Sequence, residues 1–281
     1  MPAVPPTTVF IAAISSDIGQ SMARLYRERG WQVIGTYRDP AYLGSLANDK
    51  GVSLIRCDVT KAEEVDAVAR HLADRDARWD MFIGAVGQLS PIGPFFDSER
   101  DEWLQSLYLN GSAQLALLHA VHRFRRARPH ARVAFLVGGA INRAFINYSA
   151  YSLGKLALVK FCELIHEECS DIHAIAVGTG WVATKIHQQT IAAADRAGDN
   201  LARTEQFLSG REQGTSVADV MACIDWCFSQ ERDLTGGRNF SVVHDPWHDG
   251  GSALADQLRR DNGKFKLRRH ADAATAKSAS S

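Results

Sequence analysis

Short apolar segments alternate along the chain with longer segments that carry apolar residues at helical spacing. The first apolar run, residues 8–14 (TVFIAAI), is rich in β-branched residues, as expected of a strand buried on both faces. A helical pattern from about residue 18 to residue 29 follows, Gly30 ends it, and a second strand over 32–37 stops at Arg38. These three elements, within about 30 residues, predict one parallel crossover unit.

The alternation continues to near residue 243. Further strands are predicted over 52–57, 81–86, 132–137, 172–177 and 239–243, and further helices over 62–72, 99–126, 151–169 and 217–228. This order predicts the α/β class: a doubly wound, Rossmann-type parallel sheet of about seven strands, with helices on both faces, in a single domain. Ligands bind such sheets beyond the carboxyl ends of the strands. Arg38, Asp58, Gly87, Gly138 and Gly178 fall at those ends.

The remaining segments predict how the chain is divided. We expect a flexible leader over 1–7, the folded domain over 8–250, and an extension over 251–281 that is disordered at its small, polar end. Segment 185–213, between the sixth strand and the next helix, is predicted to be a mobile lid over a substrate pocket. For the basic run 264–269 we expect a fold over the pocket, a subunit contact or a solvated tail.

Composition and charge exclude several classes of function. The chain has 281 residues, 46% of them hydrophobic, enough for one large core. Its 32 Lys and Arg balance 32 Asp and Glu, so we expect no nucleic-acid partner and no anionic membrane surface. No apolar stretch approaches the roughly 20 residues of a membrane helix, and the N-terminus lacks a basic start followed by an apolar run.

The cysteines and histidines point to no metal or disulfide chemistry. The 5 cysteines are dispersed and lack Cys-x-x-Cys spacing, which favours free thiols in a reducing compartment. We therefore expect a cytoplasmic protein. Pro246 prevents a helix from aligning His244 and His248, so no metal site is predicted there.

Tyr151 and Lys155 are the candidate catalytic pair. Four residues apart on a predicted helix, they project from the same face. A nearby ammonium group lowers the pKa of a phenol from its usual value of about 10, which makes the phenol a better acid or base for a carbonyl or an alcohol. The same spacing also arises from ordinary packing with a solvated lysine, so the rest of the chain must decide.

Five segments, in the same order, resemble the motifs of the short-chain dehydrogenase/reductase family, from Thr8 to about Val243. They are the glycine-rich turn (residues 12–19, AAISSDIG), the adenine-contacting Asp58 with Val59, the active-site Asn110 that bends the long helix, the signature Tyr151 and Lys155, and the Gly-x-Val-x-Thr segment (180–184, GWVAT).

The resemblance implies hydride transfer between a nicotinamide cofactor and a carbonyl or alcohol carbon. Tyr151 would protonate the oxygen, Lys155 would hold the ribose and lower the tyrosine pKa, and Asn110 would help position a water that relays protons. The implied cofactor contacts are Ala13, Ser15, Ser16, Asp17, Ile18, Gly19, Tyr37, Arg38, Asp58, Val59, Gly87, Tyr151, Lys155, Val182 and Thr184.

The end of the second strand predicts which nicotinamide cofactor binds. Tyr37 stands where NAD-using members carry an Asp for the ribose 2′-hydroxyl, and Arg38 offers a charged fork for a 2′-phosphate. NADP is therefore favoured over NAD. The alternative is that Arg38 is a plain surface cation.

Several positions depart from the family pattern. Gly138 stands where a serine hydrogen-bonds the substrate carbonyl, and losing such a donor costs about 2.7–4 kcal/mol of transition-state stabilisation. The substitutes within reach along the chain are Asn142, Asn147, Ser149 and Ser152; alternatively, Gly138 makes room for a bulky substrate. Milder departures are Ala13 and Asp17 in the glycine-rich turn, residues 84–87 (GAVG) in place of Asn-Asn-Ala-Gly, and Thr179 in place of a proline.

These observations leave three functional hypotheses. The leading one is an NADP-dependent oxidoreductase acting on a small carbonyl or alcohol, and the others are a cofactor-binding sensor or scaffold without turnover and a non-redox lyase or isomerase.

The predicted helices over 99–126 and 151–169 are apolar on more than one side, which favours a homodimer or homotetramer. Asp17 is predicted to cap the first helix, and Trp181 either to contact a substrate or to pack in the core.

Overall fold

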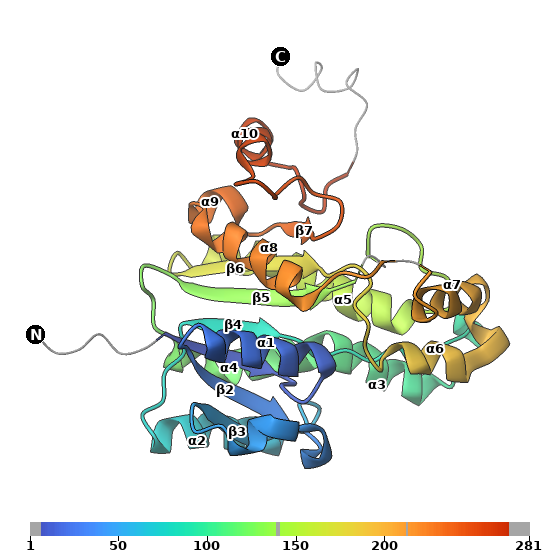
Figure 1. Cartoon of the computed structure of the whole chain (residues 1–281), viewed down its shortest axis with the longest axis horizontal. Helices are drawn as coiled ribbons and strands as arrows, with labels where there is room; N and C mark the ends of the chain where they lie inside the picture. The colour runs from blue at the N-terminus through green and yellow to red at the C-terminus, as the bar shows by residue number, and fades with distance from the viewer. Residues whose placement is uncertain (1–6, 139–140, 212, 270–281) are drawn as a thin grey trace, which may run out of the picture.

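Seven parallel strands form one sheet in the order β3-β2-β1-β4-β5-β6-β7 (Figure 1). The structure is a computed structural model, and it describes residues 7–138, 141–211 and 213–269. The strands are β1 (Thr8–Ala12), β2 (Gln32–Tyr37), β3 (Val52–Arg56), β4 (Met81–Gly84), β5 (Ala131–Val137), β6 (Ile172–Gly178) and β7 (Asn239–Ser241). The predicted α/β class and doubly wound topology are confirmed.

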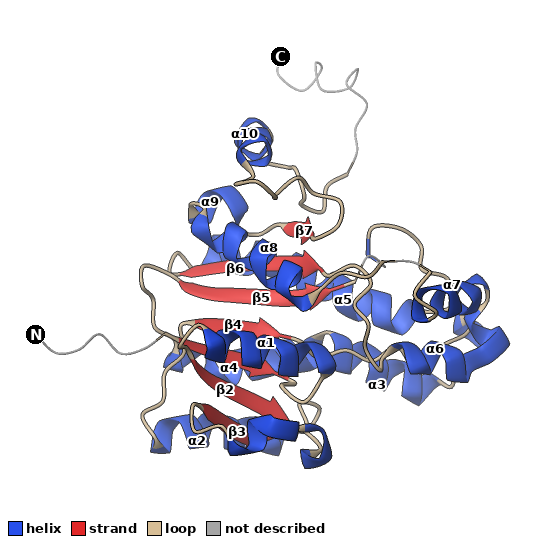
Figure 2. Cartoon of the chain, viewed as in Figure 1, coloured by secondary structure: helices blue, strands red, loops and turns tan. Residues whose placement is uncertain are grey.

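Helices cover both faces of the sheet (Figure 2). They are α1 (Asp17–Glu28), α2 (Ala62–Asp74), α3 (Arg100–Asn110), α4 (Ser112–Val121), α5 (Ser149–Glu168), α6 (His187–Ala193), α7 (Asp199–Leu208), α8 (Val217–Ser229), α9 (Arg232–Thr235) and α10 (Ser252–Arg260). Alternate residues of β1 serve the two faces, as a buried strand requires. Val9 and Ile11 pack with α1 and α8, whereas Phe10 packs with α2, α4 and α5.

The long helix predicted over 99–126, with a bend at Asn110, is two helices in the structure, divided at Gly111. α3 ends at Asn110 and α4 begins at Ser112, with Gly111 at φ −121° and ψ −94°. The break lies where the two helices cross α5 closely. A Cβ on Gly111 would lie 3.0 Å from the carbonyl oxygen of Gly154, and a Cβ on Gly154 would lie 2.6 Å from Cβ of Asn110. Two glycines thus bring Asn110 against the helix that carries Tyr151.

The first turn differs from the prediction in two details. β1 ends at Ala12, two residues early, because Ala13 adopts φ 61°. Ser16, and not Asp17, caps α1: its Oγ accepts the N–H of Gly19 at 3.0 Å. This leaves the Asp17 carboxylate available for another contact.

The predicted lid, residues 185–213, contains helices α6 and α7, which its mixed small and polar residues did not reveal. It packs on a small cluster that includes Leu89 and Tyr148. The Tyr148 hydroxyl bonds the Thr190 hydroxyl at 3.0 Å, and Asn200 donates to the carbonyl of Ile146 at 3.2 Å. These bonds join the lid to the loop before α5; its mobility stays a prediction.

The C-terminal extension continues the fold beyond residue 250. Leu254 of α10 joins the main core, and Phe265 packs on Phe240 of β7 at a ring separation of 5.7 Å. Arg268 pairs with Glu163 on α5, so the run 264–269 lies against the β7 side of the molecule and does not line the cavity described below. The disorder predicted for the leader and the tail concerns residues 1–6 and 270–281, which lie outside the described residues.

Two properties of the described residues bear on function. None of their helices has the length and apolar character needed to cross a membrane. Nowhere among them do three His, Cys, Asp or Glu side chains converge as a metal ion would require.

Candidate active site

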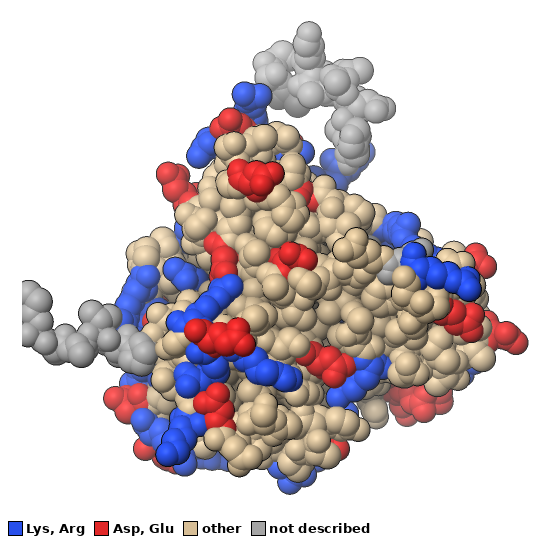
Figure 3. Space-filling model, in the orientation of Figure 1, with Lys and Arg blue, Asp and Glu red and all other residues tan. Residues whose placement is uncertain are grey.

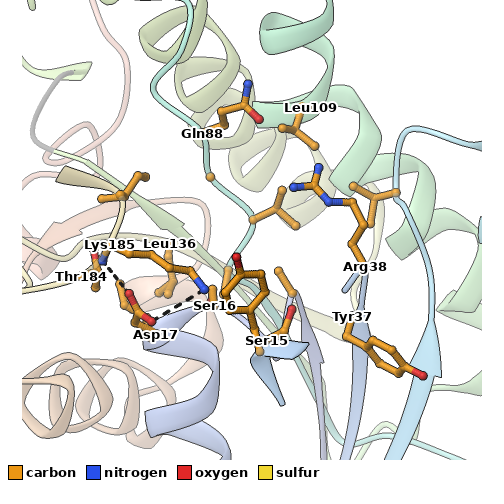
Figure 4. Close-up of a pocket in the computed structure, with 18 of the residues that line it drawn as sticks. Ser15, Ser16, Asp17, Tyr37, Arg38, Gln88, Leu109, Leu136, Thr184 and Lys185 are labelled. Carbon is orange, nitrogen blue, oxygen red and sulfur yellow. Dashed lines mark hydrogen bonds and ion pairs between the residues drawn. The ribbon is translucent and has the colours of Figure 1, made fainter. Parts of the chain in front are cut away.

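A cavity of about 440 Å³ opens beyond the carboxyl ends of β1, β2, β4 and β5 (Figure 4). We call its two ends the Arg38 end and the Tyr151 end. The predicted site residues that line it are Ala13, Ser15, Ser16, Asp17, Ile18, Tyr37, Arg38, Asp58, Val59, Gly87, Tyr151, Lys155 and Thr184. Three further residues were predicted to belong to the site but are buried and do not line the cavity: Gly19, Val182 and Asn110.

The turn between β1 and α1 keeps the form of an anion site despite its missing glycines. Ala13 takes up the left-handed conformation that a glycine adopts more easily. A Cβ on Gly19 would collide with the carbonyl oxygen of Ala13, so the turn stays tight only because Gly19 is a glycine. Among the described residues, no acceptor engages the backbone N–H of Asp17 or Ile18. Free N–H groups at a helix start suit a phosphate group.

The Asp17 carboxylate is turned toward the lid (Figure 4). Its Oδ2 accepts the backbone N–H of Lys185 at 2.6 Å, and its Oδ1 lies 4.0 Å from Lys185 Nζ. That ammonium group also lies 3.6 Å from the ring centroid of Tyr42, in the loop after β2. Lys185 thus links the first turn, the loop after β2 and the lid. Its positive charge also reduces the repulsion that the Asp17 carboxylate would exert on a bound phosphate.

Arg38 extends toward the centre of the cavity, whereas the Tyr37 ring points to its outer side (Figure 4). Arg38 is exposed, and no hydrogen bond or ion pair within the described part of the chain engages its guanidinium. Asp58 lies near it. Burial alone would raise the pKa of Asp58, but two hydrogen bonds from Thr60 and the charges of Arg38 and Lys61 lower it. This end of the cavity therefore offers one unengaged cation beside a carboxylate that stays ionised.

Tyr151 and Lys155 lie on α5 at the other end of the cavity. Lys155 is buried, and its Nζ donates to the carbonyls of Val86 at 2.7 Å and Leu136 at 2.9 Å. Burial raises the pKa of Tyr151 to about 12 and lowers the pKa of Lys155 to about 7. The expected lowering of the tyrosine pKa by Lys155 is therefore not found in this geometry, in which Nζ lies 5.9 Å from the ring centroid. The phenol is protonated at neutral pH.

Asn110 anchors the loop that follows β4. Its Nδ2 donates to the carbonyls of Gln88 at 2.8 Å and Ser106 at 2.9 Å, and its Oδ1 accepts the N–H of Gln88 at 3.0 Å. The backbone carbonyl of Asn110 accepts Nε2 of Gln114 at 2.9 Å, and that Nε2 lies 3.4 Å from the Val86 carbonyl that Lys155 also uses. Gln114 is a site-supporting residue that the sequence did not reveal. The role of Asn110 in positioning a water stays a prediction.

Gly138 lies directly against the Tyr151 hydroxyl. A Cβ built on Gly138 would lie 2.7 Å from Tyr151 Oη, so the phenol occupies space that a larger residue would need. No hydrogen bond of this hydroxyl is found among the described residues. The substitute donors considered above do not line the cavity: Asn142, Asn147, Ser149 and Ser152. Ser149, for example, accepts Trp103 Nε1 at 2.9 Å instead.

Sequence reasoning missed two glutamines in the cavity wall. Gln88 follows β4, and Gln189 lies on α6. Gln189 Oε1 accepts the backbone N–H groups of Leu89 at 2.8 Å and Ser90 at 3.0 Å. No motif marks this contact between positions that are 100 residues apart in the chain. Trp181 packs on His187 and Phe207 in the lid and does not line the cavity.

This cavity, with a helix start at one end and a tyrosine and a lysine at the other, defines a dinucleotide-dependent class of α/β protein. The family model described as enoyl-(acyl carrier protein) reductase matches residues 12–242. The chain belongs to the short-chain dehydrogenase/reductase family.

Individual relatives agree with this assignment. L-fucose dehydrogenase of Oryctolagus cuniculus is 26% identical over 240 residues, which cover 82% of this chain and 84% of that protein. A Shigella flexneri protein described as a short-chain dehydrogenase, complexed with NADP, superposes with a TM-score of 0.69 at 17% identity, covering 84% of this chain and 96% of that one. NAD+-bound xylitol dehydrogenase superposes with a TM-score of 0.72 at 17% identity, with coverage of 84% and 97%. Members of this fold thus occur with either cofactor.

Proposed function

We propose that the protein is an NADP-dependent oxidoreductase that interconverts a small carbonyl compound and its alcohol, with Tyr151 as acid and base. The observation that carries the proposal is that one cavity is lined by the Tyr151 hydroxyl, the Lys155 ammonium group and the free N–H groups that start α1. Arg38 supports NADP, because its unengaged guanidinium matches a 2′-phosphate.

The residues present fit a nicotinamide dinucleotide. The N–H groups of Asp17 and Ile18 suit the diphosphate, and Lys155 in its protonated form, with two of its three N–H donors on carbonyls, retains one for a ribose hydroxyl. When bound, the nicotinamide supplies or accepts the hydride. The protonated Tyr151 gives its proton to the carbonyl oxygen in the reductive direction and takes it back in the oxidative one.

The test has a binding step and a turnover step. Purified protein is titrated with NADPH and with NADH while nicotinamide fluorescence is followed, and a panel of ketones and aldehydes is then screened by loss of reduced-nicotinamide absorbance. We expect tighter binding of NADPH and turnover of some carbonyls. Binding without turnover would support the sensor or scaffold, and product formation without nicotinamide oxidation would support a lyase or isomerase.

We also propose a homodimer or homotetramer. Large apolar side chains are exposed on α3 and α5: Leu104, Tyr108, Leu153 and Leu164. A second copy could cover these two helices.

Figure 3 shows acidic and basic side chains interspersed on one face, which supports a small-molecule substrate rather than nucleic acid or a membrane as partner. Five free cysteines support a cytoplasmic location.

A further inference from the structure

Gln189 holds its side-chain amide in a fixed orientation at the Tyr151 end of the cavity. The N–H groups of Leu89 and Ser90 both donate to one atom, at 2.8 and 3.0 Å, and only the amide oxygen can accept them. Oε1 of Gln189 therefore binds the loop after β4, and Nε2, which carries two hydrogens, is available as a donor. Nε2 has no acceptor within the described part of the chain.

The neighbours of Gln189 place it beside the catalytic pair. Ile186, three residues earlier and hence on the same side of the helical turn, packs against the same buried cluster as Tyr151 does. A Cβ on Gly87 would lie 3.7 Å from Ile186 Cδ1 and 3.9 Å from Lys155 Nζ, so these side chains meet at one point of the wall. Gln189 lines the same cavity and is half-buried.

The helix that carries Gln189 is held on both sides. The following residue, Thr190, is buried and its hydroxyl bonds that of Tyr148, which lies one turn before Tyr151. At the other side, the backbone N–H of Lys185 donates to Asp17 at 2.6 Å. A donor held by so many contacts is preorganised, which is what stabilisation of a developing charge requires.

We propose that Gln189 Nε2 donates a hydrogen bond to the substrate carbonyl oxygen, in place of the serine hydroxyl that Gly138 cannot provide. This rests on the function proposed above. In the reductive direction a bound reduced nicotinamide would supply a hydride, with its two electrons, to the carbonyl carbon. The π pair would then move onto the oxygen, and the proton of the Tyr151 hydroxyl would bond to that oxygen. The tyrosine regains a proton from solvent, and Gln189 keeps both of its own.

Gln189→Glu separates donation from lid anchoring, because the carboxylate keeps an acceptor for Leu89 and Ser90 while it loses the donor and adds a negative charge. Gln189→Met loses both. The exposed neighbour on the same helix provides the matched control, Gln188→Met. The measurements are kcat and KM for a carbonyl that the wild type reduces, the Kd of NADPH, and hydrogen exchange at the two loop N–H groups.

We expect kcat to fall about 100-fold in Gln189→Glu and in Gln189→Met. NADPH affinity should stay within about threefold in both. The exchange protection of Leu89 and Ser90 should be retained in the Glu variant and lost in the Met variant, while Gln188→Met should match the wild type in every measurement.

A Glu variant with wild-type kcat overturns the proposal and leaves the oxidoreductase function standing. Loss of activity in the Met variant alone, together with lost protection, identifies a lid anchor and also overturns it. If the wild type reduces no carbonyl while binding NADPH, the proposed function fails, and the role of Gln189 fails with it.

Discussion

The two ends of the cavity use their polar groups in opposite ways. At the Arg38 end, the guanidinium and the N–H groups of Asp17 and Ile18 are unengaged among the described residues. At the Tyr151 end, Lys155 and Gln189 are each held by backbone groups of neighbouring loops and strands. The polar groups at the Arg38 end are therefore available to bind an anionic ligand, whereas those at the Tyr151 end already hydrogen-bond to the backbone.

This difference predicts unequal consequences for two positions at which the sequence departs from the family pattern. Ala13 replaces a glycine at the Arg38 end, and its backbone still adopts φ 61°, so the turn is preserved at the cost of local strain. The family resemblance predicts a serine where Gly138 stands at the Tyr151 end, and no backbone conformation would supply the hydroxyl of that serine. Where backbone N–H groups bind the ligand, a substitution changes mainly stability. Where a side chain supplies the hydrogen bond, another residue must supply it after a substitution.

The largest effect is expected from Tyr151→Phe, which removes the only proton donor that we assign to the reaction. The rate of carbonyl reduction should fall about 10³-fold, within the range of general acid catalysis. NADPH affinity, measured by nicotinamide fluorescence, should change less than about threefold, because the ring remains. Undiminished turnover would remove Tyr151 from the mechanism.

Arg38→Leu tests the other end of the cavity. The charge-assisted hydrogen bonds of Arg38 to a 2′-phosphate should contribute about 1.5–3 kcal/mol, so the Kd of NADPH should rise about 10- to 100-fold. The Kd of NADH should not change. Arg70→Leu, an exposed arginine on α2, serves as the control. An equal loss for both cofactors would show that Arg38 does not select NADP.

Gly138→Ala probes the contact beneath the phenol. The new Cβ would lie 2.7 Å from Tyr151 Oη, so the hydroxyl must move, and kcat should fall about 10-fold because small misplacements of reacting groups are costly. The matched control is Gly178→Ala, whose Cβ would make an ordinary 3.5 Å contact with the Phe240 carbonyl. If Gly138→Ala is as active as this control, the space around the phenol is not critical.

The buried lysine predicts a pH dependence of stability. Its folded-state pKa of about 7 lies below the unfolded value of about 10.4, so between about pH 7.5 and 8.5 the unfolded chain holds a proton that the folded chain has lost. The free energy of unfolding of the cofactor-free protein should therefore rise by about 1 kcal/mol over that unit. Urea unfolding should show a smaller rise in Lys155→Met, and equal rises in both proteins would contradict the assignment.

The smallest effect is expected from Ala13→Gly. Relief of the left-handed conformation is worth roughly 1–2 kcal/mol, and the greater flexibility of an unfolded glycine costs roughly 0.5–1 kcal/mol. The variant should be more stable by about 0.5 kcal/mol in urea unfolding. A clear loss of stability would show that the Ala13 methyl makes compensating contacts.

The parallel sheet followed from local patterns, because buried parallel strands are continuous apolar runs, and the family resemblance at the strand ends supplied about half of the residues that line the cavity. The features that were missed depend on contacts between distant segments. The helix break at Gly111 reflects its close approach to Gly154, and the position of Gln189 depends on two N–H groups 99 and 100 residues away. The family resemblance placed a bend at Asn110 but did not reveal that the helix divides there, and no local motif marks Gln189.

The central claim is hydride transfer at the Tyr151 end of this cavity. The most direct measurement follows deuterium from NADPH, labelled at its reactive ring carbon, during reduction of a carbonyl by the wild-type protein. The account predicts that the label appears on the carbinol carbon of the alcohol, and that Tyr151→Phe forms this product about 10³-fold more slowly. Label that stays on the nicotinamide while the carbonyl compound is consumed would contradict it.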